Sequence, residues 1–435
     1  MHPVATEGST PAATATGSGE SGQGGFVLQP GWGVTEPAGF RAGGLHCGIK
    51  KRKPDLGWIV ADAPCAAAGV FTRNRVHAPC VDLTRASLEA GGRLQAVVCN
   101  SGNANVCTPR AAADAAEIQA LAAQALGIPA RWVAVAQTGV IGAPMPMEAV
   151  RAGLARLPAV TSAAGGGAFA EAILTTDTRT KQWGALCRLP GAGGPEGDEP
   201  GRVVRIGGAA KGSGMIHPQM ATMLAFLTTD AAVEPGALQQ LLREVTDRTF
   251  NTVTVDGDTS TNDMVLVLAS GRAGGAPLAP GRPGWETFAA ALEAVCDRLA
   301  REIAADGEGA TRLITVTVEG APDDAAARRI ARTVAGSPLV KAAVHGADAN
   351  WGRILAAAGR AGVDIDPGRV DIDLGPLPVC RGGLGVPFDE AAATAYLRSP
   401  EVVIHLRLGL GEGRGRAYGC DLSPDYVHIN ASYRT

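Results

Sequence analysis

The sequence predicts a mixed α/β protein, and three observations support that fold class. From about Gly39 onward, short runs of β-branched residues alternate with Ala- and Leu-rich helical segments. The length of 435 residues is enough for two large layers or two domains, each with its own apolar core. Apolar runs are all shorter than a membrane span. The chain is therefore expected to fold around sheets covered by helices.

The first half of the chain contains strands that run into polar or glycine-rich loops. Residues 94–99 read as a strand, and the polar residues 100–105 that follow read as a tight loop. Residues 110–126 form a strong helical pattern, with Gly127 placed to end the helix in a left-handed conformation. A strand at 132–136 runs directly into Gln137-Thr138-Gly139. Another strand, at 203–206, precedes Lys211.

The second half continues the same alternation. Helices are expected at 235–249, 285–304 and 323–334. The expected strands are 252–255, 264–269, 313–318, 370–372, 402–408 and 416–420. A polar turn over 256–263 separates the first two of these strands.

Composition argues against several classes of protein. The net charge is -3 with 19% charged residues, which gives no strong field for nucleic acid or an acidic membrane surface. Nine cysteines, an odd number, are spread without CxxC or zinc-ligand spacing, so no metal site is expected. Buried free thiols in a reducing compartment explain them best. Small-molecule chemistry is the class that remains.

Two segments read as additions to the folded core. Residues 1–25 are rich in Gly, Ser, Thr, Ala and Pro, without a positive or apolar targeting region, and are expected to form a disordered tail. A GxGxxG match at Gly17, Gly19 and Gly22 lacks the strand and helix that a dinucleotide site needs. Residues 191–201 read as a surface loop. The protein is expected in the cytoplasm.

The most informative segment is KGSGMIHPQMATML, which begins at Lys211 and contains Ala221-Thr222. If the bond between these two residues is cut, Thr222 gains a free α-amine whose pKa is roughly 7.7 to 8.0. An amine beside a hydroxyl makes a self-contained base and nucleophile. By itself, however, a Thr in a Met- and Leu-rich segment is more often a core or strand residue.

Other polar turns offer partners for such a nucleophile. Thr138-Gly139 is a candidate oxyanion hole, because glycine leaves its N–H unshielded, although an ordinary turn explains it equally well. Lys211 could hold a phosphate or a carboxylate, and Glu308 could meet a cationic group or simply be solvated. Near residue 350, Asp348 or Asn350 could cap a helix and Arg353 could pair with an acid.

Seven motifs in one order, covering about Gly39 to Thr435, resemble the ornithine acetyltransferase family, also called glutamate N-acetyltransferase. They are KGSGMIHPQMATML, TGVIG, LTTDT, FNTVTVDGDTSTND, DGEGAT, HGADANWGRI and DYVHINASYRT. The resemblance implies a layered α/β sandwich of that family's type. It also implies a precursor that cleaves itself before Thr222 into an α chain, 26–221 after the tail, and a β chain, 222–435.

The resemblance also assigns roles to individual residues. Thr222 is implied as the nucleophile, with Thr138 and Gly139 as the oxyanion hole. Positions implied to bind substrate are Lys211, Thr222, Glu308, Asn430, Thr435 and one of Thr175 and Thr176. Two positions depart from the family pattern: Gln219 stands where Asn is usual, and Gln137 where Ser is usual. Neither has a catalytic role.

The implied reaction moves the acetyl group of N2-acetylornithine to glutamate in two half reactions through acetyl-Thr222. No cofactor is expected, although acetyl-CoA is a candidate second donor that would make the enzyme bifunctional. The implied assembly is an α2β2 heterotetramer. Two alternatives remain: an autoprocessed amidase or aminopeptidase, in which water attacks the acyl-enzyme, and a non-catalytic ligand-binding protein.

Overall fold

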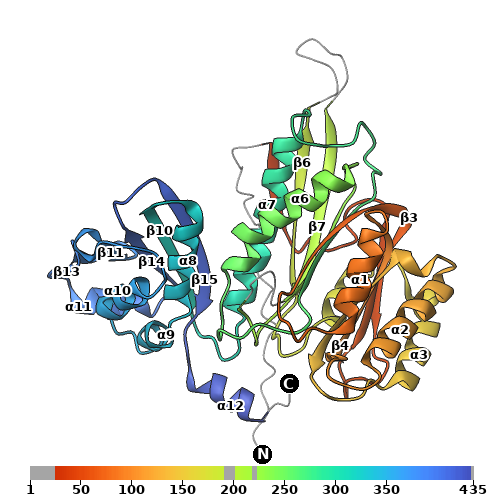
Figure 1. Cartoon of the computed structure of the whole chain (residues 1–435), viewed down its shortest axis with the longest axis horizontal. Helices are drawn as coiled ribbons and strands as arrows, with labels where there is room; N and C mark the ends of the chain where they lie inside the picture. Colours follow the sequence, from red (N-terminus) through yellow and green to blue (C-terminus); the bar gives the residue numbers. More distant parts are fainter. Residues whose placement is uncertain (1–24, 191–200, 218–222, 433–435) are drawn as a thin grey trace, which may run out of the picture.

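The chain forms two lobes, each built on its own β-sheet (Figure 1). The computed structural model describes residues 25–190, 201–217 and 223–432. Helix α7 lies between the lobes and contacts β6 and β7 on one side and β15 and β10 on the other. Tyr418 Oη, on β15, adds a link by donating to Asp297 of α7 at 3.1 Å. The predicted mixed α/β class is confirmed.

The larger sheet has nine strands in the order β1-β6-β7-β8-β9-β3-β4-β5, with β2 paired to β3. Its strands are β1 (Phe26–Pro30), β2 (Phe40–Leu45), β3 (Leu56–Phe71), β4 (Arg93–Asn103), β5 (Val133–Val140), β6 (Lys181–Leu189), β7 (Arg202–Lys211), β8 (Leu224–Thr229) and β9 (Met264–Ala269). All residues of β8 and β9 are buried, as expected for central strands covered on both faces.

The order of the strands mixes parts of the chain from either side of residue 222. β8 pairs antiparallel with β7, with Leu224 opposite Lys211, and parallel with β9. β9 in turn pairs antiparallel with β3, with Met264 opposite Phe71. Two strands that follow residue 222 are therefore inserted between strands that precede it.

Helices cover both faces of this sheet. The helices of this lobe are α1 (Pro79–Glu89), α2 (Ala111–Leu126), η1 (Ala130–Trp132), α3 (Met147–Ala155), α4 (Leu157–Val160), α5 (Gly166–Ala172), α6 (Pro235–Arg248), η2 (Phe250–Thr252) and α7 (Trp285–Ala305). α6 and α7 pack on one face, where Leu227 and Val267 meet Leu242 and Leu299. On the opposite face, Phe169 of α5 packs edge-on against Phe226 of β8.

The smaller lobe is a six-stranded sheet in the order β13-β12-β11-β14-β10-β15. It comprises β10 (Leu313–Ala321), α8 (Asp324–Ala335), α9 (Pro338–His345), α10 (Trp351–Gly359), η3 (Pro367–Arg369), β11 (Asp371–Leu374), β12 (Leu377–Arg381), β13 (Leu384–Gly385), α11 (Glu390–Leu397), β14 (Glu401–Arg407) and β15 (Gly413–Cys420). α8 packs on β10 and β15, and the Asp323 carboxylate caps it by accepting from Ala326 N. The final helix, α12 (Pro424–Ser432), lies outside this sheet.

The predicted elements largely match, with two instructive differences. The loop expected after residue 99 is strand as far as Asn103, because β5 pairs in parallel with it through Asn100 and Gln137. The strand expected at 252–255 is wrong: Thr252 is the last residue of η2, and the residues after it form a single bridge, between Val253 and Tyr418. Gly127 ends α2 in the left-handed conformation, with φ of 67°, as predicted.

Two expectations from composition can be compared with the described residues. All nine cysteines are free, and seven of them are buried, whereas Cys107 is exposed and Cys47 is intermediate. Burial raises the pKa of the Cys65 thiol to about 12, which keeps it protonated and inert. Across the described ranges, no helix combines the length and apolar character needed to cross a bilayer.

Candidate active site

Ends of strands and loops from both halves of the chain surround a cavity of about 240 Å³. Seven of the residues predicted from the sequence line this cavity: Thr138, Gly139, Thr175, Thr176, Lys211, Glu308 and Asn430. Ala221, Thr222 and Thr435 lie outside the described residues. The structure thus brings together residues that are up to 292 positions apart in the sequence, Thr138 and Asn430.

The chain on both sides of the predicted cleavage point belongs to the wall of this cavity. Met215 and Ile216 line it before residue 218, and Met223 lines it after residue 222. The Asp256 carboxylate fixes the first side, since it accepts from Met215 N at 2.6 Å and from Ile216 N at 2.9 Å. Burial raises the pKa of Asp256. Met215 has φ of 55°, a left-handed conformation that these two hydrogen bonds help to hold.

Thr138 and Gly139 lie near the end of β5, beside β4. Gly139 has φ of 133°, and a Cβ atom there would come within 2.3 Å of the carbonyl carbon of Gly102. Only glycine fits this position. Lys211 Nζ donates to Thr138 Oγ1 at 3.5 Å, so a positive charge lies beside the predicted oxyanion hole. Lys211 is the last residue of β7, so the strand expected at 203–206 extends as far as this lysine.

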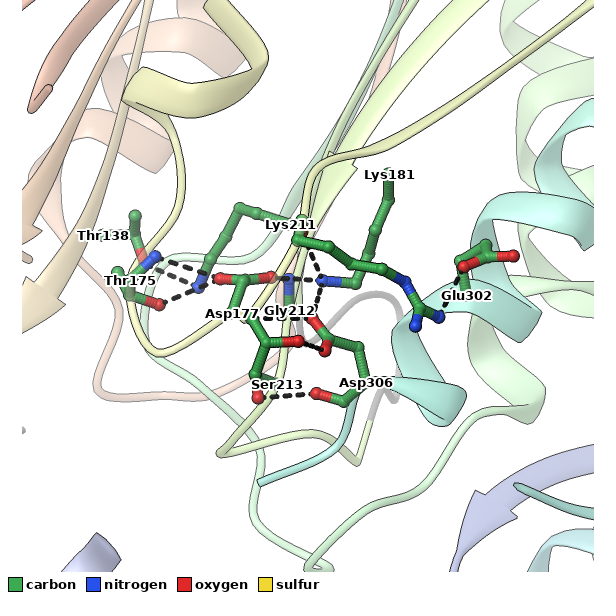
Figure 2. Close-up of polar contacts among 11 residues, drawn as sticks. Thr138, Thr175, Asp177, Lys181, Lys211, Gly212, Ser213, Glu302 and Asp306 are labelled. Carbon is green, nitrogen blue, oxygen red and sulfur yellow. Dashed lines mark hydrogen bonds and ion pairs between the residues drawn. The ribbon is translucent and has the colours of Figure 1, made fainter. Parts of the chain in front are cut away.

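A buried ionic network that the sequence did not predict lies next to the cavity. It joins Asp177, Lys181 and Asp306. Figure 2 shows Lys181 Nζ between Asp177 Oδ1 and Asp306 Oδ2, each at 2.6 Å. Asp177 also accepts from Gly212 N at 2.7 Å and from Thr175 N at 3.0 Å. The two aspartates occur within the LTTDT and DGEGAT motifs, which is the signal that could have found them.

Charge balance keeps this network ionised. Burial alone would raise the pKa of the Asp177 carboxyl, but Lys211 and Lys181, with the hydrogen bonds from Lys181 and Thr175, hold it well below its usual range. Asp177 therefore carries a negative charge at neutral pH. Because Asp177 accepts from both Thr175 N and Gly212 N, this carboxylate links the Thr175 loop to the residue that follows Lys211.

Glu308 lines the cavity and is 5% exposed. Its Oε2 accepts from Asn430 Nδ2 at 2.8 Å, so α12 contributes to the site. Its backbone N donates to Ser213 O at 3.0 Å. A Cβ at Gly214 would come within 2.3 Å of the Glu308 carboxylate, which explains the glycine there. The interpretation of Glu308 as a solvated turn residue is wrong.

The helix-capping prediction near residue 350 is resolved by the structure. Asn350 caps α10 by accepting from Arg353 N at 3.3 Å. Arg353 donates to the carbonyl oxygen of Leu339 at 3.1 Å rather than pairing with an acid. Neither residue lines the cavity, so this motif serves the smaller lobe.

His217, next to the cavity-lining residue Ile216, gives the protein a predicted pH dependence of stability. Burial, and then the charge of Arg332, lower its pKa to about 4, while Nδ1 is 2.9 Å from Thr254 Oγ1. As pH falls from about 6.5 towards 4, the unfolded chain gains a proton at His217 that the folded chain does not, so stability falls. His217→Asn should recover about 1 kcal/mol of the stability lost between pH 7 and 5. Thermal unfolding in phosphate-free buffer at both pH values measures this, and equal losses for the two proteins would contradict it.

Comparison with known proteins decides the family. The chain matches the ArgJ family over residues 41–435. The chain belongs to the ArgJ family. The "Arginine biosynthesis bifunctional protein ArgJ" of Symbiobacterium thermophilum is 56% identical over 93% of this chain and 98% of its own length. The ArgJ of Geobacillus kaustophilus is 50% identical over 92% and 96%. A crystal structure of ArgJ from Bacillus halodurans is 49% identical, covers 47% of this chain and 97% of its own, and has a TM-score of 0.47.

Membership of the ArgJ family confirms the resemblance that the sequence motifs indicated. It also confirms the predicted acetyl transfer in arginine biosynthesis, and it does not favour the amidase or aminopeptidase alternative. The assignment covers the smaller lobe as well as the larger one, because the match extends to the last residue.

Proposed function

We propose that this ArgJ-family enzyme moves the acetyl group of N2-acetylornithine to glutamate, giving ornithine and N-acetylglutamate through an acetyl-Thr222 intermediate. The observation that carries this proposal is the pair of opposite charges in one cavity: Lys211 is 6% exposed and Glu308 is 5% exposed. An amino acid has one group for each of them. Glu308 is assigned to the ammonium end of the substrate and Lys211 to its carboxylate.

In the first half reaction, Thr222 Oγ attacks the acetyl carbon and the α-amine of Thr222 takes the hydroxyl proton. The bond from the acetyl carbon to nitrogen breaks, the amine returns the proton to ornithine, and an ester remains. The amine of glutamate then attacks this ester and reverses the steps. Thr138 and Gly139 are assigned to the oxyanion of both half reactions, where one donor is typically worth about 100- to 1000-fold in rate.

The reaction is tested by incubating the purified protein with N-acetylornithine and glutamate. Equal amounts of ornithine and N-acetylglutamate are expected, because each acetyl group that leaves one amine reaches the other. Release of acetate without N-acetylglutamate would refute the transferase and point to hydrolysis. Glutamate with acetyl-CoA in place of N-acetylornithine tests the second donor, which we propose as a co-substrate with no other cofactor.

Processing and assembly complete the proposal. The precursor cuts itself between Ala221 and Thr222, giving an α chain that ends at residue 221 and a β chain of residues 222–435. Asn430, Thr435 and one of Thr175 and Thr176 are assigned to substrate binding. The assignment of Asn430 is supported by its hydrogen bond to Glu308, in which Asn430 Nδ2 donates to Glu308 Oε2 at 2.8 Å. The two chains are proposed to assemble as an α2β2 heterotetramer in the cytoplasm.

The assigned role of Glu308 predicts a specific kinetic effect. Glu308→Gln keeps the size of the side chain and its contact with Asn430 but removes the charge that faces the substrate ammonium. KM for N-acetylornithine should rise roughly 10- to 100-fold, since a hydrogen bond to a charged group is worth about 1.5–3 kcal/mol. Glu302→Gln is the matched control, because Glu302 pairs with Arg179 at the surface. Equal KM values for the two variants would exclude the assignment.

A further inference from the structure

A second cavity, of about 770 Å³, lies where the two lobes meet, and among the described residues none lines both this cavity and the candidate active site. Five arginines line it: Arg73, Arg328, Arg329, Arg332 and Arg360. Three of them lie on α8, Arg73 follows β3 and Arg360 follows α10. Within the part of the chain that the structure describes, Asp247 contributes the single carboxylate that lines it, and its Oδ1 accepts from Asn251 Nδ2 at 2.6 Å. The cavity therefore has a large excess of positive charge.

The charges of these arginines are not balanced by carboxylates of the described residues. None of the five forms an ion pair with a carboxylate of the described ranges, whereas other arginines of the chain, such as Arg248 with Glu293, do so at 2.7 Å. Arg329 Nη1 has a long contact of 3.4 Å with Gly362 O. A cavity lined by five guanidinium groups without paired carboxylates attracts an anion.

Among the five arginines, Arg332 has buried guanidinium nitrogens that lack a hydrogen-bond partner among the described residues. They are Nε and Nη2. These two atoms form one edge of the guanidinium, the edge that grips carboxylate or phosphate in a bidentate manner. Burial lowers the pKa of Arg332 to about 10, which still leaves it charged at neutral pH. A buried charge without a partner destabilises the protein unless a ligand compensates it.

We propose that this arginine cavity binds a phosphorylated small molecule, with its phosphate groups on Arg328, Arg329 and Arg332. Phosphate fits better than a single carboxylate, because several arginines line one cavity and each phosphate offers more acceptor oxygens and more charge. The cavity volume lies within the range of about 300–1,000 Å³ typical of small-molecule sites, so more than one phosphate group can enter. The site stands apart from the proposed acetyl transfer.

The cavity is next to the active-site segment without being part of it. His217 and Gly257 line the arginine cavity, while their neighbours Ile216, Asp256 and Asp258 line the candidate active site. The wall between the two cavities is thus one residue thick at these points. A ligand on the arginines contacts the chain five residues before Thr222.

Calorimetric titration with pyrophosphate at constant ionic strength tests the site. The double variant Arg328→Gln/Arg329→Gln should bind roughly 100-fold more weakly than wild type, since each lost charge-assisted contact costs about tenfold. The charge-matched control is Arg398→Gln/Arg414→Gln, on exposed residues of the same lobe that do not line the cavity. The control should bind as wild type does.

The outcomes distinguish binding in the arginine cavity from nonspecific attraction of anions to the protein surface. Equal binding by the double variant and its control would overturn the proposal, as would the absence of saturable binding by wild type at millimolar pyrophosphate. Thermal unfolding verifies that both double variants are folded. Repeating the titration with ADP and with inorganic phosphate identifies the source: tighter ADP binding indicates a nucleotide, and similar or weaker ADP binding indicates the phosphate group alone, both on the same arginines.

Discussion

Thr222→Ala is expected to yield one uncleaved chain and essentially no acetyl transfer. The loss should be on the order of 10⁶-fold in kcat, the size that follows removal of a catalytic nucleophile from a well-studied hydrolase. The physical reason is twofold, since the variant lacks the hydroxyl that attacks the acetyl carbon and does not generate the α-amine that takes its proton. Denaturing electrophoresis and the coupled assay of ornithine and N-acetylglutamate measure the two effects.

Thr222→Ser separates the two roles of this residue. Serine keeps a hydroxyl and, after cleavage, an α-amine, so it should be cut into two fragments and retain measurable transfer. A wild-type chain that stays intact and is nevertheless active would refute the amine as base. The cavity supports the choice of this segment, because Ile216 before it and Met223 after it both line the wall that also holds Thr138 and Gly139.

Lys181→Met should lower the free energy of unfolding by about 3–5 kcal/mol, the usual cost of removing one partner from a buried ion pair. Methionine fills a similar volume, so the loss reports mainly on the carboxylates of Asp177 and Asp306, each 2.6 Å from Lys181 Nζ. The side chains of Lys181 and Asp177 are fully buried, so water cannot replace the lost partner. Denaturant unfolding measures the loss.

A matched control lies two residues away. Arg179 pairs with Glu302 at 2.7 Å, but half of the Arg179 side chain is exposed. Arg179→Met should therefore cost no more than about 1 kcal/mol. A similar loss of unfolding free energy in Lys181→Met and Arg179→Met would mean that the buried ion pairs of Lys181 stabilise the protein no more than a surface pair does. In Lys181→Met, catalysis should also fall, because Asp177 holds both Gly212 and Thr175 at the cavity.

The sequence was most successful where a residue acts through a local motif. Thr138, Lys211 and Glu308 were predicted from long motifs, and the structure brings all three to one cavity. α7 was likewise predictable, because its apolar side chains recur with helical spacing and its observed bounds are Trp285–Ala305. These features depend on neighbours within one segment.

What was missed depends on pairing between distant segments. Asp306 and Lys181 are 125 positions apart, and only the folded arrangement brings their side chains to 2.6 Å. The polar residues Asn100 to Asn103 lack a strand pattern, yet they are strand because β5 supplies partners. The arginine cavity is the same kind of case, since Arg73 and Arg332 come from different lobes.

The insertion of β8 and β9 between β7 and β3 constrains the order of two events, the folding of the chain and the proposed cleavage before Thr222. Leu224 is already hydrogen-bonded in register with Lys211 of β7 and Met264 of β9. A chain cut before this sheet forms would have to thread two central strands into a sheet made by a separate fragment. If the chain is cleaved before Thr222 as proposed, folding therefore comes first and cleavage second, and separately produced halves should fail to reassemble. The proposed cut would then create a new N-terminus at Thr222, while β8 would stay paired with β7 and β9 in the sheet.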